Sequence, residues 1–160
     1  MPTKRLFFST SVVNDKIYVI GGWVNNAYLP TVEVYDPVIN RWKKKSDMLT
    51  AREFLSTSVV DGKIYAVGGR SNLRDTIATV EVYDTSQDTW TEAPDMPTAR
   101  RGLSTAVVRG RIYAIGGRVG IRGEGISTVE VYDTGLGVKA KGKLTTLWGK
   151  LKSEAKVNLR

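Results

Sequence analysis

Arginine side chains recur at fixed positions along this chain of 160 residues, and their chemistry is the recognition of anions. Arg5, Arg52 and Arg100 each lie 16 positions before the first residue of a glycine pair. A guanidinium group presents a planar fork of N–H donors that can bind a carboxylate at two points. The sequence therefore offers a repeated set of carboxylate-binding groups. An architectural role is the alternative for these three, because they are the same in every repeat.

The segments that follow the glycine pairs carry a second set of candidate residues. These segments contain 8, 9 and 10 residues and share almost no sequence. Because the scaffold does not dictate a segment that varies, its polar and aromatic side chains are candidates for binding, with an ordinary solvated loop as the alternative. Together with the three arginines, the candidate partner-binding residues are Trp23, Asn25, Asn26, Tyr28, Arg70, Asn72, Arg74, Arg118 and Arg122.

The residue types also limit which chemistry the chain can perform. It contains no His and no Cys. It therefore lacks the commonest general base, the commonest metal ligand and any thiolate nucleophile. We expect no catalytic residue, no metal site and no cofactor.

The elements that would position the candidate residues repeat three times. Residues 9–22, 56–69 and 104–117 read STSVVNDKIYVIGG, STSVVDGKIYAVGG and STAVVRGRIYAIGG. Two apolar strands joined by a pair such as Asp61-Gly62 are typical of a hairpin with a type I′ turn. A third strand, TVEVYD, follows at 31–36, 79–84 and 128–133, and Trp42 and Trp90 head a fourth. Each repeat, near 48 residues long, therefore predicts a small four-stranded antiparallel sheet.

These features resemble the Kelch repeat, through the turn Arg, the double glycine, and the Tyr and Trp separated by six residues. The resemblance covers residues 1–137 and implies an all-β fold of three β-propeller blades, in a partial or oligomer-completed propeller. With the hairpin strands of each blade named A and B, TVEVYD named C and the Trp strand named D, antiparallel order places the B–C loops and the D–A turns on one face. The implied repeats are 1–47, 48–95 and 96–137. In the third, Lys139 stands where a Trp is expected, which leaves the fourth strand of that blade open.

Residues that recur within the implied blades are expected to be structural. The Tyr and Trp side chains are interpreted as core anchors, and the strand-C glutamates as partners in pairing between blades rather than as catalytic acids. The members of these sets are Tyr35, Tyr83, Tyr132, Trp42 and Trp90, and Glu33, Glu81 and Glu130.

The segment 138–160 has a different composition from the repeats. It holds seven Lys or Arg and one acid, a charge of +6, whereas the remaining 17 basic and 15 acidic residues leave +2. Leu144, Leu147, Trp148 and Leu151 are spaced as on one face of a short basic amphipathic helix, which Gly149 weakens. Such a tail, as helix or strand, could cover the open end of the third blade. The alternative is contact with a nucleic acid or a membrane surface.

The Kelch resemblance implies a noncatalytic module that binds a protein or peptide, and the arginines favour an acidic one. An alternative is part of a carbohydrate-active enzyme such as a sialic acid mutarotase, for which Asp75 and Glu124 are the only acids in the variable loops. The nearly balanced charge of the repeats argues against a nucleic-acid or membrane partner.

Three blades leave an apolar face exposed at each end of the array. Two copies could therefore form a homodimer that completes a six-bladed ring, and the alternative is that the chain is a piece of a longer array. No secretory signal is visible, so the expected compartment is the cytoplasm.

Overall fold

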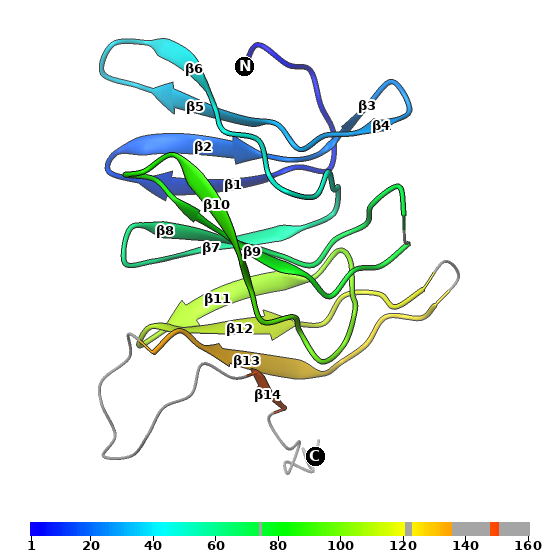
Figure 1. Ribbon diagram of the computed structural model, residues 1–160. Helices are drawn as coiled ribbons and strands as arrows, with labels where there is room; N and C mark the ends of the chain where they lie inside the picture. Colours follow the sequence, from blue (N-terminus) through cyan, green and yellow to red (C-terminus); the bar gives the residue numbers. More distant parts are fainter. Residues whose placement is uncertain (74, 121–122, 136–147, 151–160) are drawn as a thin grey trace, which may run out of the picture.

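The fold consists of three stacked antiparallel sheets, one for each repeat (Figure 1). The computed structural model describes residues 1–73, 75–120, 123–135 and 148–150. The first sheet contains, in order, β1 (Ser9–Val13), β2 (Lys16–Ile20), β5 (Val32–Asp36) and β6 (Arg41–Lys45). The second contains β7 (Ser56–Val60), β8 (Lys63–Val67), β9 (Val80–Asp84) and β10 (Thr89–Ala93). The third contains β11 (Ser104–Val108), β12 (Arg111–Ile115), β13 (Val129–Asp133) and β14 (Trp148–Lys150). A separate two-stranded hairpin of β3 (Trp23–Val24) and β4 (Ala27–Tyr28) lies between β2 and β5 along the chain.

The hairpin that opens each sheet has the turn that its sequence predicts. In the second sheet Val60 pairs with Lys63, so that Asp61 and Gly62 form a two-residue loop with φ values of 50° and 70°. Positive φ at both central residues is what a type I′ turn requires. The corresponding turns of the other two sheets also have two consecutive residues with positive φ. The hairpin prediction is confirmed.

The first strand of each sheet lies innermost, where neighbouring sheets contact one another. Hydroxyl groups join these strands: the Ser9 and Thr57 side-chain oxygens lie 2.8 Å apart, as do those of Ser56 and Thr105. The outer strands β6, β10 and β14 lie at the opposite edges of their sheets. This is the arrangement of propeller blades, but the three sheets do not close into a ring (Figure 1).

Two apolar layers, one between each pair of sheets, form the core of the described residues. Tyr83, Tyr132 and Trp90 are buried in these layers, as the sequence predicts. Tyr35 and Trp42 are only half-buried, so their assignment to the core is wrong for this chain. They belong to the face of the first sheet on which no other sheet of the described residues packs.

The fourth strand of the third sheet comes from the segment expected to be a tail. Trp148 pairs with Tyr132, and their ring centroids lie 5.3 Å apart. The corresponding Tyr83–Trp90 rings of the second sheet lie 5.0 Å apart, so Trp148 takes the place of the missing Trp. Residues 148–150 are therefore strand, and the amphipathic helix is wrong for them. The rest of that expected helix, and Lys139, lie outside the described residues.

A search of the described residues for a membrane-crossing helix, one both long and apolar enough, finds none.

Candidate functional site

The variable loops and the segments that precede β1, β7 and β11 meet at one end of the sheets, which we call the loop face (Figure 1). In each repeat, the residue after the turn Arg and the residue after the glycine pair are joined by two backbone hydrogen bonds. Their N···O distances are 2.8–3.0 Å, and this bridge holds two side chains next to each other. The bridged pairs are Leu6 with Trp23, Glu53 with Arg70, and Arg101 with Arg118.

The bridged pairs change in character from one repeat to the next. The first is apolar, the second combines an acid with a base, and the third consists of two arginines. A cavity of about 840 Å³ opens among them on the loop face. The same scaffold position thus gives this cavity one aromatic side and one cationic side.

The aromatic side depends on an unusual backbone conformation. Phe7 and Phe54, at equivalent positions, have φ values of 57° and 53°, in the left-handed region. Their rings stack with centroids 4.2 Å apart, and the Phe54 N–H donates to the Phe7 carbonyl at 2.9 Å. The third repeat has Gly102 at this position, so no third ring fills the cavity. Trp23 and Tyr28 extend the aromatic lining.

The cationic side is partly neutralised by two carboxylates. Asp75 Oδ1 lies 3.1 Å from Arg70 Nε and 3.3 Å from Arg101 Nη1. Glu53 Oε1 lies 3.4 Å from Arg70 Nη1. Burial raises the pKa of Glu53, and the nearby Arg70 and Arg101 oppose that effect. Both arginines also lie over aromatic rings, Arg70 over Tyr28 and Arg101 over Phe54.

Arg118 differs from the other two arginines of the cavity. Its side chain is exposed, and no carboxylate in the described part of the chain forms an ion pair with it. It is therefore the arginine of this cavity whose charge is least compensated by the protein itself.

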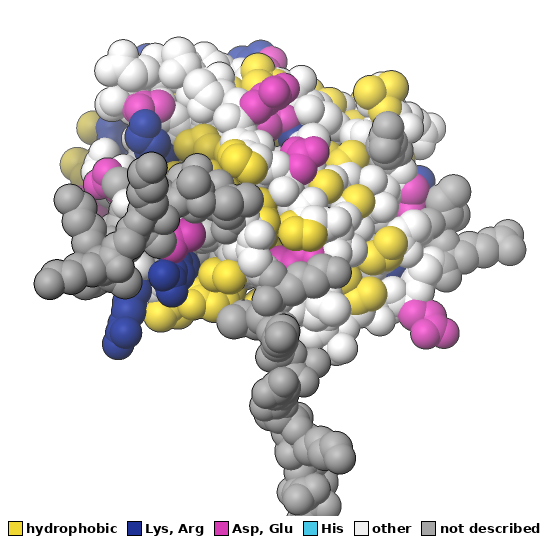
Figure 2. Space-filling view, turned by 60° about the horizontal axis from the view of Figure 1, so that its bottom comes forward, with side chains coloured by type: hydrophobic (Ala, Val, Ile, Leu, Met, Phe, Trp, Pro, Cys, Tyr) yellow, Lys and Arg dark blue, Asp and Glu magenta, His cyan; other side chains and the backbone are white. Residues whose placement is uncertain are grey.

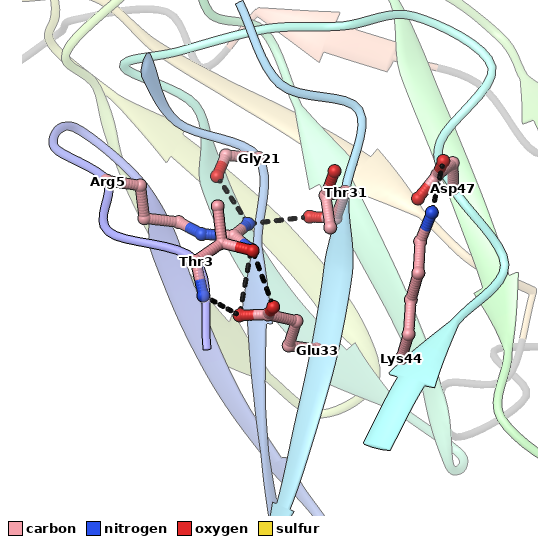
Figure 3. Close-up of polar contacts among 7 residues, drawn as sticks. All are labelled: Thr3, Arg5, Gly21, Thr31, Glu33, Lys44 and Asp47. Atoms are coloured by element: carbon pink, nitrogen blue, oxygen red, sulfur yellow. Dashed lines mark hydrogen bonds and ion pairs between the residues drawn. The ribbon is translucent and has the colours of Figure 1, made fainter. Parts of the chain in front are cut away.

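The recurring arginines occupy the interior of each blade. Arg5 Nη1 donates to the carbonyls of Gly21 and Thr31, at 2.9 and 2.8 Å, and Nη2 lies 2.9 Å from Glu33 Oε2 (Figure 3). Arg52 pairs with Glu81 and Arg100 with Glu130 in the same way. All three side chains are fully buried, so their inclusion among the partner-binding residues is wrong in this structure. Burial lowers the pKa of Arg52, and Glu81 opposes that effect.

The arginine–glutamate pairs also correct the expected role of the glutamates. Each pair lies within one repeat, not between blades. Adjacent blades are joined here by the backbone of the arginine, because the N–H groups of Gly22 and Gly69 donate to the Arg52 and Arg100 carbonyls at 2.9 Å. The arginine therefore fixes a segment whose main chain connects neighbouring blades.

The other predicted residues divide into three groups. Trp23, Asn26, Tyr28, Arg70 and Arg118 line the cavity. Asn25 and Asn72 are exposed but do not line it. Arg74 and Arg122 lie outside the described residues.

Besides the glycines Gly102 and Gly117, sequence reasoning missed four residues that line the cavity. These four are Phe7, Glu53, Phe54 and Arg101. Each lies one or two positions after a turn Arg, at positions that differ between repeats. That variation is the same signal that identified the loops.

Comparison with known families matches residues 1–134 to the KLHDC2/KLHL20/DRC7 Kelch-repeats domain. Comparison with curated proteins gives no significant match. The family match spans all three hairpins, and the three sheets have the strand order expected of Kelch blades. The chain belongs to the Kelch-repeat family.

Proposed function

We propose that this chain is a noncatalytic interaction module that binds a peptide carboxylate, with a neighbouring apolar side chain, in the cavity on its loop face. Kelch-repeat domains commonly serve as protein-interaction modules, which supports the general class. The finer assignment rests on one observation: an exposed arginine without an internal carboxylate partner, among the described residues, borders a cavity with an aromatic side.

The shape and lining of the cavity support a ligand with both an acidic and an apolar part. Its volume of about 840 Å³ is in the range of ligand pockets, about 300–1,000 Å³. The stacked Phe7 and Phe54 rings offer a rigid apolar surface with little entropy to lose. Arg118 offers two-point geometry to a carboxylate. A peptide that places an acidic group at Arg118 and an apolar side chain on the two rings would contact both the cationic and the aromatic side of the cavity.

Internal ion pairs determine which arginines take part in this binding. Arg70 and Arg101 already have Asp75 and Glu53 near them, and these carboxylates keep both guanidinium groups in place. An incoming carboxylate at either would compete with a built-in anion. Arg118 therefore carries the largest share of the specificity for an acid, and Arg70 and Arg101 shape the wall.

The placement of Asp75 also favours binding over catalysis. The enzyme alternative needs an acid that faces the arginines across the cavity. Asp75 instead lies against Arg70 and Arg101 as their counter-ion, and Glu124 is exposed and does not line the cavity.

A peptide array tests the proposal directly. The array pairs each Phe-Glu or Leu-Glu peptide with its Phe-Gln or Leu-Gln counterpart, and fluorescently labelled protein is applied at fixed ionic strength. We expect the Glu member of a pair to be preferred, and Arg118→Glu to lose at least about tenfold in affinity for it, as loss of an arginine–carboxylate contact does. Arg109→Glu is the matched control, because it makes the same charge change in an exposed turn at the opposite end of the third sheet.

Two results would reject the assignment. One is an array with no preference for Glu over Gln. The other is an equal loss of binding in Arg118→Glu and Arg109→Glu, which would indicate general charge attraction instead of a site. Thermal unfolding of each variant establishes that it is folded.

A further inference from the structure

The two joints between neighbouring sheets use the same contacts. At each, the first glycine of the pair has no room for a side chain: a Cβ on Gly21 or Gly68 would lie 2.7 or 2.6 Å from the next arginine's carbonyl oxygen. A methionine and a leucine of the next repeat close over the same glycine. The second glycine donates its N–H to that carbonyl at 2.9 Å. A joint therefore has two halves, which we call the glycine half, formed by the glycine pair, and the turn half, formed by the turn of the following repeat.

The third sheet presents a glycine half that nothing covers in the described part of the chain. Within 4 Å of a Cβ on Gly116, the only neighbouring atom among these residues is the Ile126 carbonyl oxygen, at 3.3 Å. Val108 is 53% exposed, whereas its counterpart Val60, inside the second joint, is 7% exposed. Ile115 is exposed as well. Apolar side chains gather at this end of the molecule in the view of Figure 2.

The first sheet presents the complementary turn half. Met1 is 45% exposed, whereas its counterpart Met48 is 4% exposed inside the first joint. Phe8 stands where Leu55 and Leu103 close over a glycine, and it too is exposed. Ile17 is exposed and Trp42 half-buried, although their counterparts Ile64 and Trp90 are buried. Each of these two exposed halves thus has the same residue positions as a half that is buried in both internal joints.

We infer that the two end faces bind each other between two copies of this chain, so that the third sheet of each copy packs on the first sheet of the other. The binding partner of each end face follows from the two internal joints, because in both of them a glycine pair binds the turn of the following repeat. A twofold axis through the centre of the ring makes both contacts at once and leaves no open face. The resulting ring has six blades, within the range of propellers.

The proposed contact between chains keeps one of the hydroxyl pairs of the internal joints and lacks another hydroxyl. Ser9 and Thr57 in the first joint, and Ser56 and Thr105 in the second, place Oγ and Oγ1 2.8 Å apart. The equivalent pair between chains is Ser104 with Thr10. Ala106 stands where Ser11 and Ser58 donate a further hydrogen bond, so this contact has one hydroxyl fewer than the internal joints.

Light scattering on the purified chain of 160 residues gives the first test. We expect a mass twice that of the 17.6 kDa chain. Ile115→Asp, which places a charge on the face that carries the glycine half, should return the mass to that of one chain. Val38→Asp is the matched control and should leave the dimer intact, because Val38 is an exposed residue of the β5–β6 turn.

Engineered cysteines test the register of the contact. The chain has no Cys of its own. In the double variant Thr10→Cys with Ser104→Cys, mild oxidation should yield a covalent dimer in which both contacts are cross-linked. The pair Val38→Cys with Ser104→Cys controls for random collision and should give little cross-linking.

Three outcomes would overturn the inference. They are a folded wild-type monomer, a larger or open-ended assembly, and a dimer that survives Ile115→Asp while the Thr10→Cys, Ser104→Cys double variant forms no cross-link. The cross-linking result stands even where Ile115→Asp fails to fold. Failure of the dimer does not affect the peptide array, because the cavity on the loop face is lined within one chain.

Discussion

At the scale of single residues, the arginine–glutamate pair is the feature that each blade shares. Arg52 Nη1 donates to the carbonyls of Gly68 and Thr79, next to the ends of β8 and β9, while Glu81 accepts from Arg52 and from the Leu49 N–H. The pair therefore supplies hydrogen bonds to backbone groups at the ends of these strands, including the Thr79 carbonyl, which also accepts from the Gly68 N–H. It also fixes the segment that joins the second blade to the first.

Removing one member of this pair should be costly. We predict that Glu81→Gln lowers the free energy of unfolding by about 3–5 kcal/mol, because the Arg52 charge stays buried without its counter-ion. Urea titration at neutral pH measures this. Asp36→Asn, which removes the exposed Lys16–Asp36 pair, is the control and should lower the free energy of unfolding far less. Equal losses in the two variants would contradict the structural role of the buried pair.

A second residue-scale prediction concerns Asp88, at the edge of the first joint. Burial raises the pKa of Asp88, but hydrogen bonds from Tyr83, the Ser46 N–H and Lys45 outweigh this and hold it at about 2. Because this value lies below the ordinary 3.8, the stabilisation is complete above about pH 4 and is lost as the pH falls through 2. Asp88→Asn should therefore melt at a lower temperature than wild type at pH 6, and the two melting temperatures should converge as the pH falls to 2 and below.

The first repeat offers an internal precedent for this substitution. Asn40 occupies the position equivalent to Asp88 and accepts a hydrogen bond from Tyr35 at 2.8 Å. Asparagine thus keeps the tyrosine contact, and only the charge is removed. The effect should stay below about 1 kcal/mol, because the Asp88 side chain is 39% exposed and its ion pair is screened. A melting difference that persists unchanged at pH 2 would assign it to something other than this charge.

The residues of the cavity show what sequence can and cannot predict at this scale. Arg70, Arg118 and Trp23 were predicted because they lie in loops that vary between repeats. Arg5, Arg52 and Arg100 have the same side-chain chemistry, but residue type does not determine burial, and the strand ends enclose them. Phe7 and Phe54 were missed because their place in the cavity depends on a left-handed backbone conformation, which a phenylalanine in the sequence does not predict.

At the scale of elements, the fourth strands differ in how much each is buried. Trp90 is 9% exposed in the first apolar layer, whereas Trp42 lies half-buried on an open face. We predict that Trp90→Ala costs about 3–5 kcal/mol and Trp42→Ala less than half of that. Denaturant unfolding in the Ile115→Asp background, where no second chain covers Trp42, measures both. Equal costs would show that the first sheet is covered by something that the described residues do not include.

The fourth strands also show where sequence periodicity stops being informative. The hairpins and third strands keep a constant spacing, so their positions follow from aligned repeats. Strand β14 could not be found in this way, because Trp148 lies 16 residues after Tyr132 instead of seven. Its spacing with nearby leucines instead favoured a helix. The apolar layer against the second sheet, into which Trp148 packs, selects the strand.

At the scale of the whole molecule, the chain is a short stack in which stability depends on neighbours. Among the described residues, the second sheet packs against a sheet on both faces, whereas the first and third sheets have one such neighbour each. In repeat proteins the free energy of opening one unit is approximately its own stability plus the energies of its interfaces. The middle blade should therefore open least often.

Hydrogen exchange measures this difference blade by blade. In the Ile115→Asp variant, we predict that amides of β8 exchange roughly tenfold or more slowly than those of β2 and β12, because one additional interface worth at least about 1.4 kcal/mol protects them. In the wild-type dimer the end blades gain a neighbour, so the rates of all three sheets should become similar. Equal rates in the variant would show that the three blades unfold as one cooperative unit. Unequal rates that remain unchanged in the wild type would show that the end faces stay uncovered in solution.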